Sequence, residues 1–154
     1  MRMTPFDALK AQLSAVVPFA TYVGVAIEEI GEGRATATLD QTHNTSNHIA
    51  TMHAGALFTL AEAASGAAMA GLFLERLAAL RPVAAGSTIA YAKPARGLIT
   101  AHAAVDGEKA ALFATLDAEG KVRFPVTIRM TDATGREVAH MSVDWHVSAL
   151  AQAA

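Results

Sequence analysis

Residues 54–74, with the sequence AGALFTLAEAASGAAMAGLFL, decide the fold of this chain. Glu62 is the only ionisable side chain in this stretch, and most of the others are small and apolar. A helix that is apolar on every side has to be surrounded by other parts of the protein. We therefore predict a buried core helix that continues past Leu74 to about Leu80.

The same stretch is long enough to cross a bilayer. Alanine and glycine, however, transfer into lipid less favourably than leucine or isoleucine, and a membrane span would leave the downstream strands without a covering helix. Near the N-terminus, Asp7 and Lys10 interrupt any apolar signal-peptide core. We expect no membrane segment and a cytoplasmic protein.

Alternating apolar and polar side chains predict six antiparallel strands around this helix. Ala139, Met141 and Val143, for example, alternate with His140 and Ser142. The predicted architecture is an α+β domain in which a curved sheet wraps around the central helix. The predicted strands are residues 22–30, 34–39, 84–93, 98–105, 122–131 and 137–148.

Two shorter helices are predicted outside the core stretch. The first runs from Thr4, which caps it, to about Val16, because Pro5 suits the first turn and Asp7 completes a capping box. The second covers residues 108–118, where apolar side chains recur on one helical face.

The composition narrows the function classes. A length of 154 residues supports a single domain, residues 1–154. The lack of cysteine excludes disulfides, thiolate zinc sites and a cysteine nucleophile. A net charge of -2 gives no electrostatic footprint for nucleic acid. Alanine supplies 36 residues, and an alanine core buries little area per residue, so we predict that the domain buries further surface against another subunit.

The start of the core helix carries candidate chemistry. The N–H groups of Ala54 and Gly55 belong to the first turn, where amides have no partner within the helix. At the positive end of a helix dipole, such donors stabilise an oxygen that gains negative charge in a transition state. Close helix packing, with water on these amides, is the alternative interpretation.

Glu62 is the second chemical feature of this helix. Burying a carboxylate costs several kcal/mol unless the group is paired or protonated. Glu62 fits a general base for water, or a nucleophile that forms an anhydride, and burial would raise its pKa toward neutrality. Alternatively, it bonds a serine or threonine across a helix, or it sits at an exposed edge.

A family motif includes these residues: Asn47, five residues, His53-Ala54-Gly55, and then Glu62, eight residues after Ala54. This pattern resembles that of hotdog-fold acyl-CoA thioesterases of the phenylacetate-pathway type, and most closely their uncharacterised DUF4442 branch. The resemblance extends over nearly the whole chain. It implies a hotdog fold, hydrolysis of an acyl-CoA to a free acid and coenzyme A, and a homodimer or homotetramer whose sheets join edge to edge. It implies no cofactor beyond the coenzyme A of the substrate.

Spacing along the core helix favours a site shared between two chains. Glu62 lies eight residues beyond Ala54, which is about 12 Å along the helix axis. A carboxylate at that distance does not easily reach a carbonyl held at the start of its own helix. The resemblance implies that the acid comes from a neighbouring subunit whose long helix runs antiparallel.

Other residues complete the candidate site. Asn47 hydrogen-bonds the thioester carbonyl or orients the attacking water, unless it is an ordinary turn residue. The resemblance gives His53 a role in shaping the loop, and we place it among the substrate-binding residues. Lys93 and Arg96 flank Pro94 and meet the phosphates of coenzyme A, unless they form a solvated rim.

The chain departs from the family motif at two places. Ala54 replaces the first glycine of the pair, which narrows access to its amide. Ala84 or Ala85 stands where the family often has a serine or threonine on the following strand, and Ser87 and Thr88 are displaced from that position. A second side chain to assist the water is therefore in doubt.

Other functions remain open from the residues alone. His43, His48 and His53 are evenly spaced, but no carboxylate or helical i, i+4 pair joins them, so we predict no metal site. A hotdog enoyl-thioester hydratase or dehydratase would need a histidine opposite an acid, and His53 is the only candidate. A non-catalytic acyl-CoA-binding protein fits the missing serine. No residue specifies the acyl group.

Overall fold

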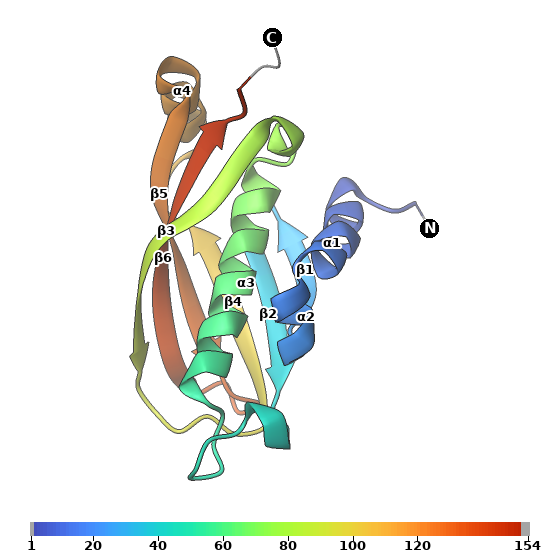
Figure 1. Cartoon of the computed structure of the whole chain (residues 1–154), viewed down its shortest axis with the longest axis vertical. Helices are drawn as coiled ribbons and strands as arrows, with labels where there is room; N and C mark the ends of the chain where they lie inside the picture. Colours follow the sequence, from blue (N-terminus) through green and yellow to red (C-terminus); the bar gives the residue numbers. More distant parts are fainter. Residues whose placement is uncertain (1, 152–154) are drawn as a thin grey trace.

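A single antiparallel sheet of six strands curls around a central helix, as the computed structural model of residues 2–151 shows (Figure 1). The strand order is β1-β2-β4-β5-β6-β3, so that β1 and β3 are the two edges. This confirms the predicted α+β architecture and the hotdog arrangement. The strands are β1 (Ala26–Gly31), β2 (Arg34–Asp40), β3 (Leu80–Tyr91), β4 (Leu98–Val105), β5 (Lys121–Thr131) and β6 (Glu137–Ala149).

The central helix is the predicted core helix. Leu60, Ala61, Ala64 and Ala68 are fully buried. By length and composition alone this helix could cross a membrane, but its burial agrees with the core-helix prediction. The helices are α1 (Pro5–Val16), α2 (Pro18–Val23), α3 (Ala54–Leu72) and α4 (Lys109–Glu119), with 3-10 turns η1 (His43–Thr45) and η2 (Leu77–Ala79).

The end of α3 differs from the prediction. The helix stops at Leu72 instead of about Leu80. Phe73 is fully buried, and its ring stacks on Phe113 and Phe124 at centroid distances of 5.1 and 5.6 Å. These aromatic contacts hold the chain at that point, and β3 then pairs with β6 from residue 80 onward, four residues before the predicted start.

The N-terminal part contains a helix that the alternation pattern missed. Pro18 does not merely follow α1, because it occupies the first turn of α2, where its missing N–H is harmless. Gly24 caps this helix with a positive φ of 103°, a conformation that glycine adopts without steric cost. The predicted strand at residues 22–30 therefore begins only at Ala26. Helices α1 and α2 lie beside α3, next to β1 (Figure 1).

Several loops gather at the end of the molecule where α3 begins (Figure 1). The Met52 N–H donates to the Ala95 carbonyl at 2.8 Å, and the Gly97 N–H donates to Gln41 Oε1 at 3.0 Å. The loop before α3 and the loop after β3 are thus bonded to each other. This arrangement places the predicted Lys93 segment at the helix start.

Candidate active site

His53 caps the start of α3. It is the N-cap residue, and its Nδ1 accepts a hydrogen bond from the Gly55 N–H at 2.8 Å. An accepting Nδ1 carries no proton, so the ring proton lies on Nε2. Ala54 and Gly55 are both exposed. Of the two predicted oxyanion donors, the Ala54 N–H is the one without a protein acceptor in residues 2–151.

Asn47 organises the loop that leads to α3. Its side-chain oxygen accepts the N–H groups of Ile49 and Thr51, at 3.1 and 3.0 Å, and its amide nitrogen donates to Thr51 Oγ1 at 2.7 Å. The loop also holds Ala50 at a φ of 58°. The turn interpretation therefore accounts for these contacts, and contact between Asn47 and a thioester stays a prediction. Thr51, which the sequence analysis did not single out, is the buried partner of Asn47.

Glu62 is half-buried on α3, and burial raises the pKa of its carboxyl above the ordinary value. Within the described part of the chain, its carboxylate has no hydrogen-bond or ion-pair partner. Ser65 donates to the Glu62 backbone carbonyl at 2.7 Å, not to its carboxylate. The structural-acid interpretation, in which Glu62 bonds a serine or threonine, finds no such bond in residues 2–151.

Three cavities follow one another along α3. The entry cavity, about 520 Å³, contains His53, Gly55 and Thr59 in its walls. The edge cavity, about 410 Å³, shares Thr59 and reaches Glu62 beside β3. The inner cavity, about 290 Å³, shares Glu62 and continues to Ala70. Glu62 thus stands where the edge and inner cavities meet, a placement that spacing along one helix does not reveal.

The edge cavity also contains the stretch of β3 that departs from the family motif. A β-bulge interrupts the pairing of β3 with β6 between Ala84 and Gly86. Ala84, Ala85 and Ser87 all line the same cavity as Glu62. Ser87 therefore lies beside the cavity that Glu62 reaches.

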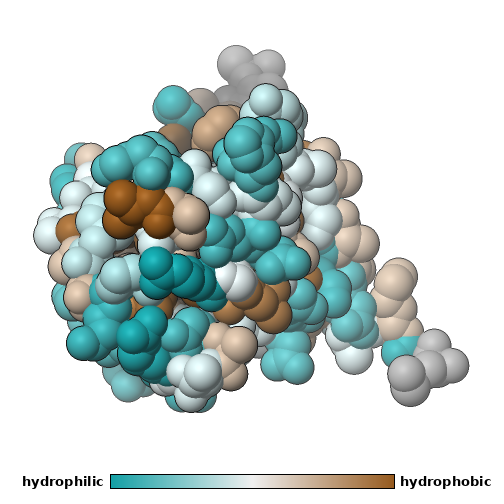
Figure 2. Space-filling model, turned by 90° about the horizontal axis from the view of Figure 1, so that it is seen from below, coloured by the Kyte–Doolittle hydropathy of each residue, from teal (hydrophilic) through white to brown (hydrophobic). Residues whose placement is uncertain are grey.

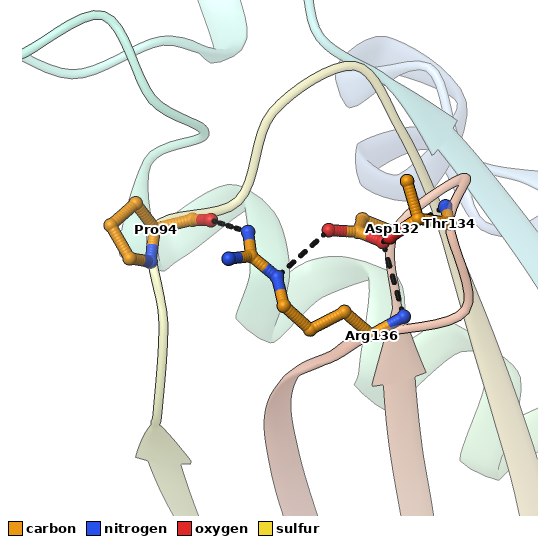
Figure 3. A network of polar contacts seen from close by, with 4 residues as sticks. All are labelled: Pro94, Asp132, Thr134 and Arg136. Carbon is orange, nitrogen blue, oxygen red and sulfur yellow. Dashed lines mark hydrogen bonds and ion pairs between the residues drawn. The ribbon is translucent and has the colours of Figure 1, made fainter.

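The two predicted phosphate-binding residues, Lys93 and Arg96, are exposed in the loop after β3. Arg136 holds this loop, because its guanidinium bonds the Pro94 carbonyl at 3.3 Å and the Asp132 carboxylate at 3.1 Å (Figure 3). Hydrophilic side chains lie beside smaller hydrophobic patches at this end of the molecule (Figure 2). The loop that carries Lys93 and Arg96 is bonded to the loop before α3, and contact of these two residues with phosphates stays a prediction.

The evenly spaced histidines at 43, 48 and 53 do not assemble into a cluster. Residues 2–151 contain no group of three or more histidine, cysteine, aspartate or glutamate side chains placed to hold a metal ion.

Trp145 and Ser65 anchor α3 next to Glu62. The buried Trp145 Nε1–H donates to Ser65 Oγ at 3.0 Å, and Ser65 is fully buried. Neither residue was singled out by the sequence analysis, although the alternation of β6 placed Trp145 on the core face.

Ser65→Ala is expected to lower the free energy of unfolding by about 1–3 kcal/mol, because the Trp145 N–H then lacks an acceptor in the core. Urea denaturation measures this change. Ser148→Ala is the matched control, since its hydroxyl makes only a 3.5 Å bond to the Arg81 carbonyl, and we expect a change within about 0.5 kcal/mol. Equal effects of the two variants would contradict the anchoring role.

Solved structures similar to this chain have the same fold. A protein of unknown function from Pseudomonas aeruginosa, described as a probable thioesterase, is 27% identical with a TM-score of 0.81, covering 94% of this chain and 95% of the other. The Escherichia coli PaaI protein from the phenylacetic acid degradation operon is 21% identical with a TM-score of 0.72, covering 94% and 93%.

A hypothetical thioesterase from Streptococcus pneumoniae, crystallised with coenzyme A, is also similar. It is 20% identical with a TM-score of 0.68, and the match covers 86% of this chain and 94% of the other. No curated protein matches the chain. The family model described as "Domain of unknown function (DUF4442)" matches residues 7–147. The chain therefore belongs to the DUF4442 family, within the hotdog fold.

Proposed function

We propose that this protein is an acyl-CoA thioesterase that hydrolyses a thioester to a free acid and coenzyme A. The observation that carries the proposal is Glu62. It is a half-buried carboxylate with a raised pKa, it has no partner in residues 2–151, and it stands between two cavities. Carboxylates with raised pKa values in clefts are typical of general bases. Similarity to probable and hypothetical thioesterases supports this reaction class.

The chemistry requires a base and an oxyanion site. Glu62 removes a proton from water, the water oxygen attacks the thioester carbonyl carbon, and the carbonyl oxygen becomes an oxyanion. The Ala54 N–H, joined by the Gly55 N–H once the oxygen displaces His53 Nδ1, stabilises that charge. The carbon–sulfur bond then breaks, and the proton on Glu62 passes to the leaving thiolate. In the alternative route, Glu62 attacks the carbonyl carbon itself, and the carbon–sulfur bond breaks to give the anhydride and coenzyme A thiolate, which takes a proton from water. A water molecule then hydrolyses the anhydride to the free acid and restores the Glu62 carboxylate.

The proposed site uses two chains, because Glu62 lies about 12 Å along the axis from its own helix start. β3 is an edge strand with a partner on one side only. Exposed apolar side chains lie near it, namely Phe58 and Tyr91, with Phe19 across the edge cavity. A second copy paired along β3, with its α3 antiparallel, would cover this surface and supply the helix start. We propose a homodimer of this kind, with pairing of two dimers as a further step.

One observation favours a second candidate, a non-catalytic acyl-CoA-binding protein. The Gly55 N–H already donates to His53, so one of the two oxyanion donors is occupied. A protein that binds the thioester without turning it over needs no free donor at this place.

A panel of acyl-CoA substrates tests the proposal by release of free coenzyme A thiol. The chain contains no cysteine, so a thiol reagent reports only the product. We expect thiol release from saturated acyl-CoAs at a rate proportional to protein concentration. Binding without thiol release would favour the binding protein, and water addition to a 2-enoyl-CoA without thiol release would favour a hydratase.

A further inference from the structure

The inner cavity lies between α3 and the two N-terminal helices. Leu13 of α1 and Val17, between α1 and α2, form one wall, and Trp145 of β6 contributes another. The α3 side is built from small residues, including Ala67 and Ala70. Larger side chains at these positions would fill the space. The alanine content of α3 therefore leaves a partly open volume of about 290 Å³ within one chain.

The lining of this cavity is mostly apolar, and Glu62 supplies its one charged side chain among residues 2–151. Its hydroxyl groups are already bonded, since Ser14 Oγ donates to the Lys10 carbonyl at 2.8 Å and Thr21 Oγ1 donates to the Ser14 carbonyl at 3.1 Å. The Trp145 Nε1–H donates its hydrogen bond to Ser65 Oγ. In the part of the chain that the structure describes, no lysine or arginine lines the cavity. These walls suit a hydrocarbon and exclude the phosphates and amides of coenzyme A.

We propose that the inner cavity holds the acyl chain of the substrate, and that this chain is a saturated aliphatic group of medium length. The orientation, with the thioester carbonyl at Glu62 and the chain end toward Ala70, rests on the proposed thioesterase function. A methylene group needs about 30 Å³, which is the volume that a water molecule takes in the liquid. A volume of 290 Å³ therefore corresponds to a chain of about ten carbons.

The chain itself provides a direct readout of occupancy. Trp145 is the only tryptophan, it is buried, and it lines the inner cavity. Alkyl-CoA thioethers are resistant to hydrolysis and serve as probes. We expect their dissociation constants, measured by Trp145 fluorescence, to fall about fourfold for each added methylene up to about eight to ten carbons, and then to level off.

The chain-length limit is the number of carbons beyond which the dissociation constant no longer falls. Two variants should move this limit in opposite directions. Ala67→Leu adds three carbons to the wall, so the limit should shorten by about three carbons. Leu13→Ala enlarges the cavity and should lengthen the limit by a similar number. Ala114→Leu makes the same change on the exposed side of α4 and should leave the limit unchanged. If Ala67→Leu fails to fold, Leu13→Ala still tests the assignment.

The binding measurements test the inner cavity as the acyl-chain site, whereas thiol release tests the thioesterase proposal. A length limit that shifts in the two variants supports the inner cavity, whether or not the protein releases thiol from acyl-CoAs. Thiol release with affinities that keep rising to sixteen carbons, or with the same limit in all variants, overturns the inner cavity and leaves the thioesterase proposal standing. Tighter binding of a phenylalkyl thioether than of an alkyl thioether of equal carbon number overturns the aliphatic assignment.

Discussion

Glu62→Gln is expected to lower kcat for acyl-CoA hydrolysis by about 10²–10⁴-fold. Glutamine has nearly the shape of glutamate, but it neither accepts a proton from water nor forms an anhydride. The dissociation constant of an alkyl-CoA thioether should change little, because the inner cavity keeps its shape. Thiol release and thioether binding, measured on the same preparation, separate the two effects.

Glu75→Gln is the matched control for this substitution. Glu75 comes directly after residues 54–74. Its side chain is 79% exposed and lies 3.9 Å from the Lys109 amine. We expect its kcat to stay within about twofold of the unchanged protein, because exposed ion pairs contribute little. Full turnover in Glu62→Gln would contradict both the base and the nucleophile roles of Glu62.

The pH dependence of the unchanged protein and of Glu62→Gln provides a second check on the role of Glu62. Burial raises the pKa of this carboxyl, and either role needs the ionised form, so kcat/KM should fall as the pH drops through the raised pKa. The free energy of unfolding changes with pH in the opposite direction to kcat/KM. The folded state holds the proton more tightly than the unfolded state, so the free energy of unfolding decreases as the pH rises from the ordinary glutamate pKa through the raised one. Glu62→Gln removes this decrease and should be at least as stable at neutral pH.

The sheet and the core helix could be predicted because each has a strong local pattern. Ala35, Ala37 and Leu39 of β2 are buried as their alternation required, and the same holds for Met141 and Val143 of β6. A hydrophobic period of two along a strand predicts which face of the strand is buried. The apolar length of α3 likewise states that something must surround it.

The features of the site that the sequence did not reveal depend on contacts between distant segments. The bond from the Gly55 N–H to His53 depends on the side-chain rotamer at the helix cap. The inner cavity exists because residues near 13–17 lie across from α3. The hydrophobic periodicity of a single helix or strand does not predict how far apart these two segments pack. The Glu62 motif could be recognised, whereas the cavities on either side of it required the packed structure.

Gly71→Ala is expected to be the most damaging single-methyl change in this protein. The Cβ of an alanine here would overlap the Gly31 carbonyl oxygen and lie 2.9 Å from Ile30 Cγ2. Backbone of β1 cannot yield to a methyl group without breaking its pairing with β2, where Gly31 faces Arg34. Alanine favours helices over glycine by about 1 kcal/mol, but the overlap outweighs this gain. We expect a loss of about 3 kcal/mol or more in the free energy of unfolding, measured by urea denaturation.

Gly31→Ala separates this packing effect from a general effect of replacing glycine. Gly31 lies on the other side of the same contact, but a Cβ on Gly31 would meet nothing within 4 Å. We expect its stability to stay within about 0.5 kcal/mol of the unchanged protein. A strong loss in Gly71→Ala with a small one in Gly31→Ala means that α3 packs directly on the β1 backbone. That contact positions the C-terminal part of the helix that carries Glu62, whereas equal effects would show that the close approach of α3 to β1 is not the cause.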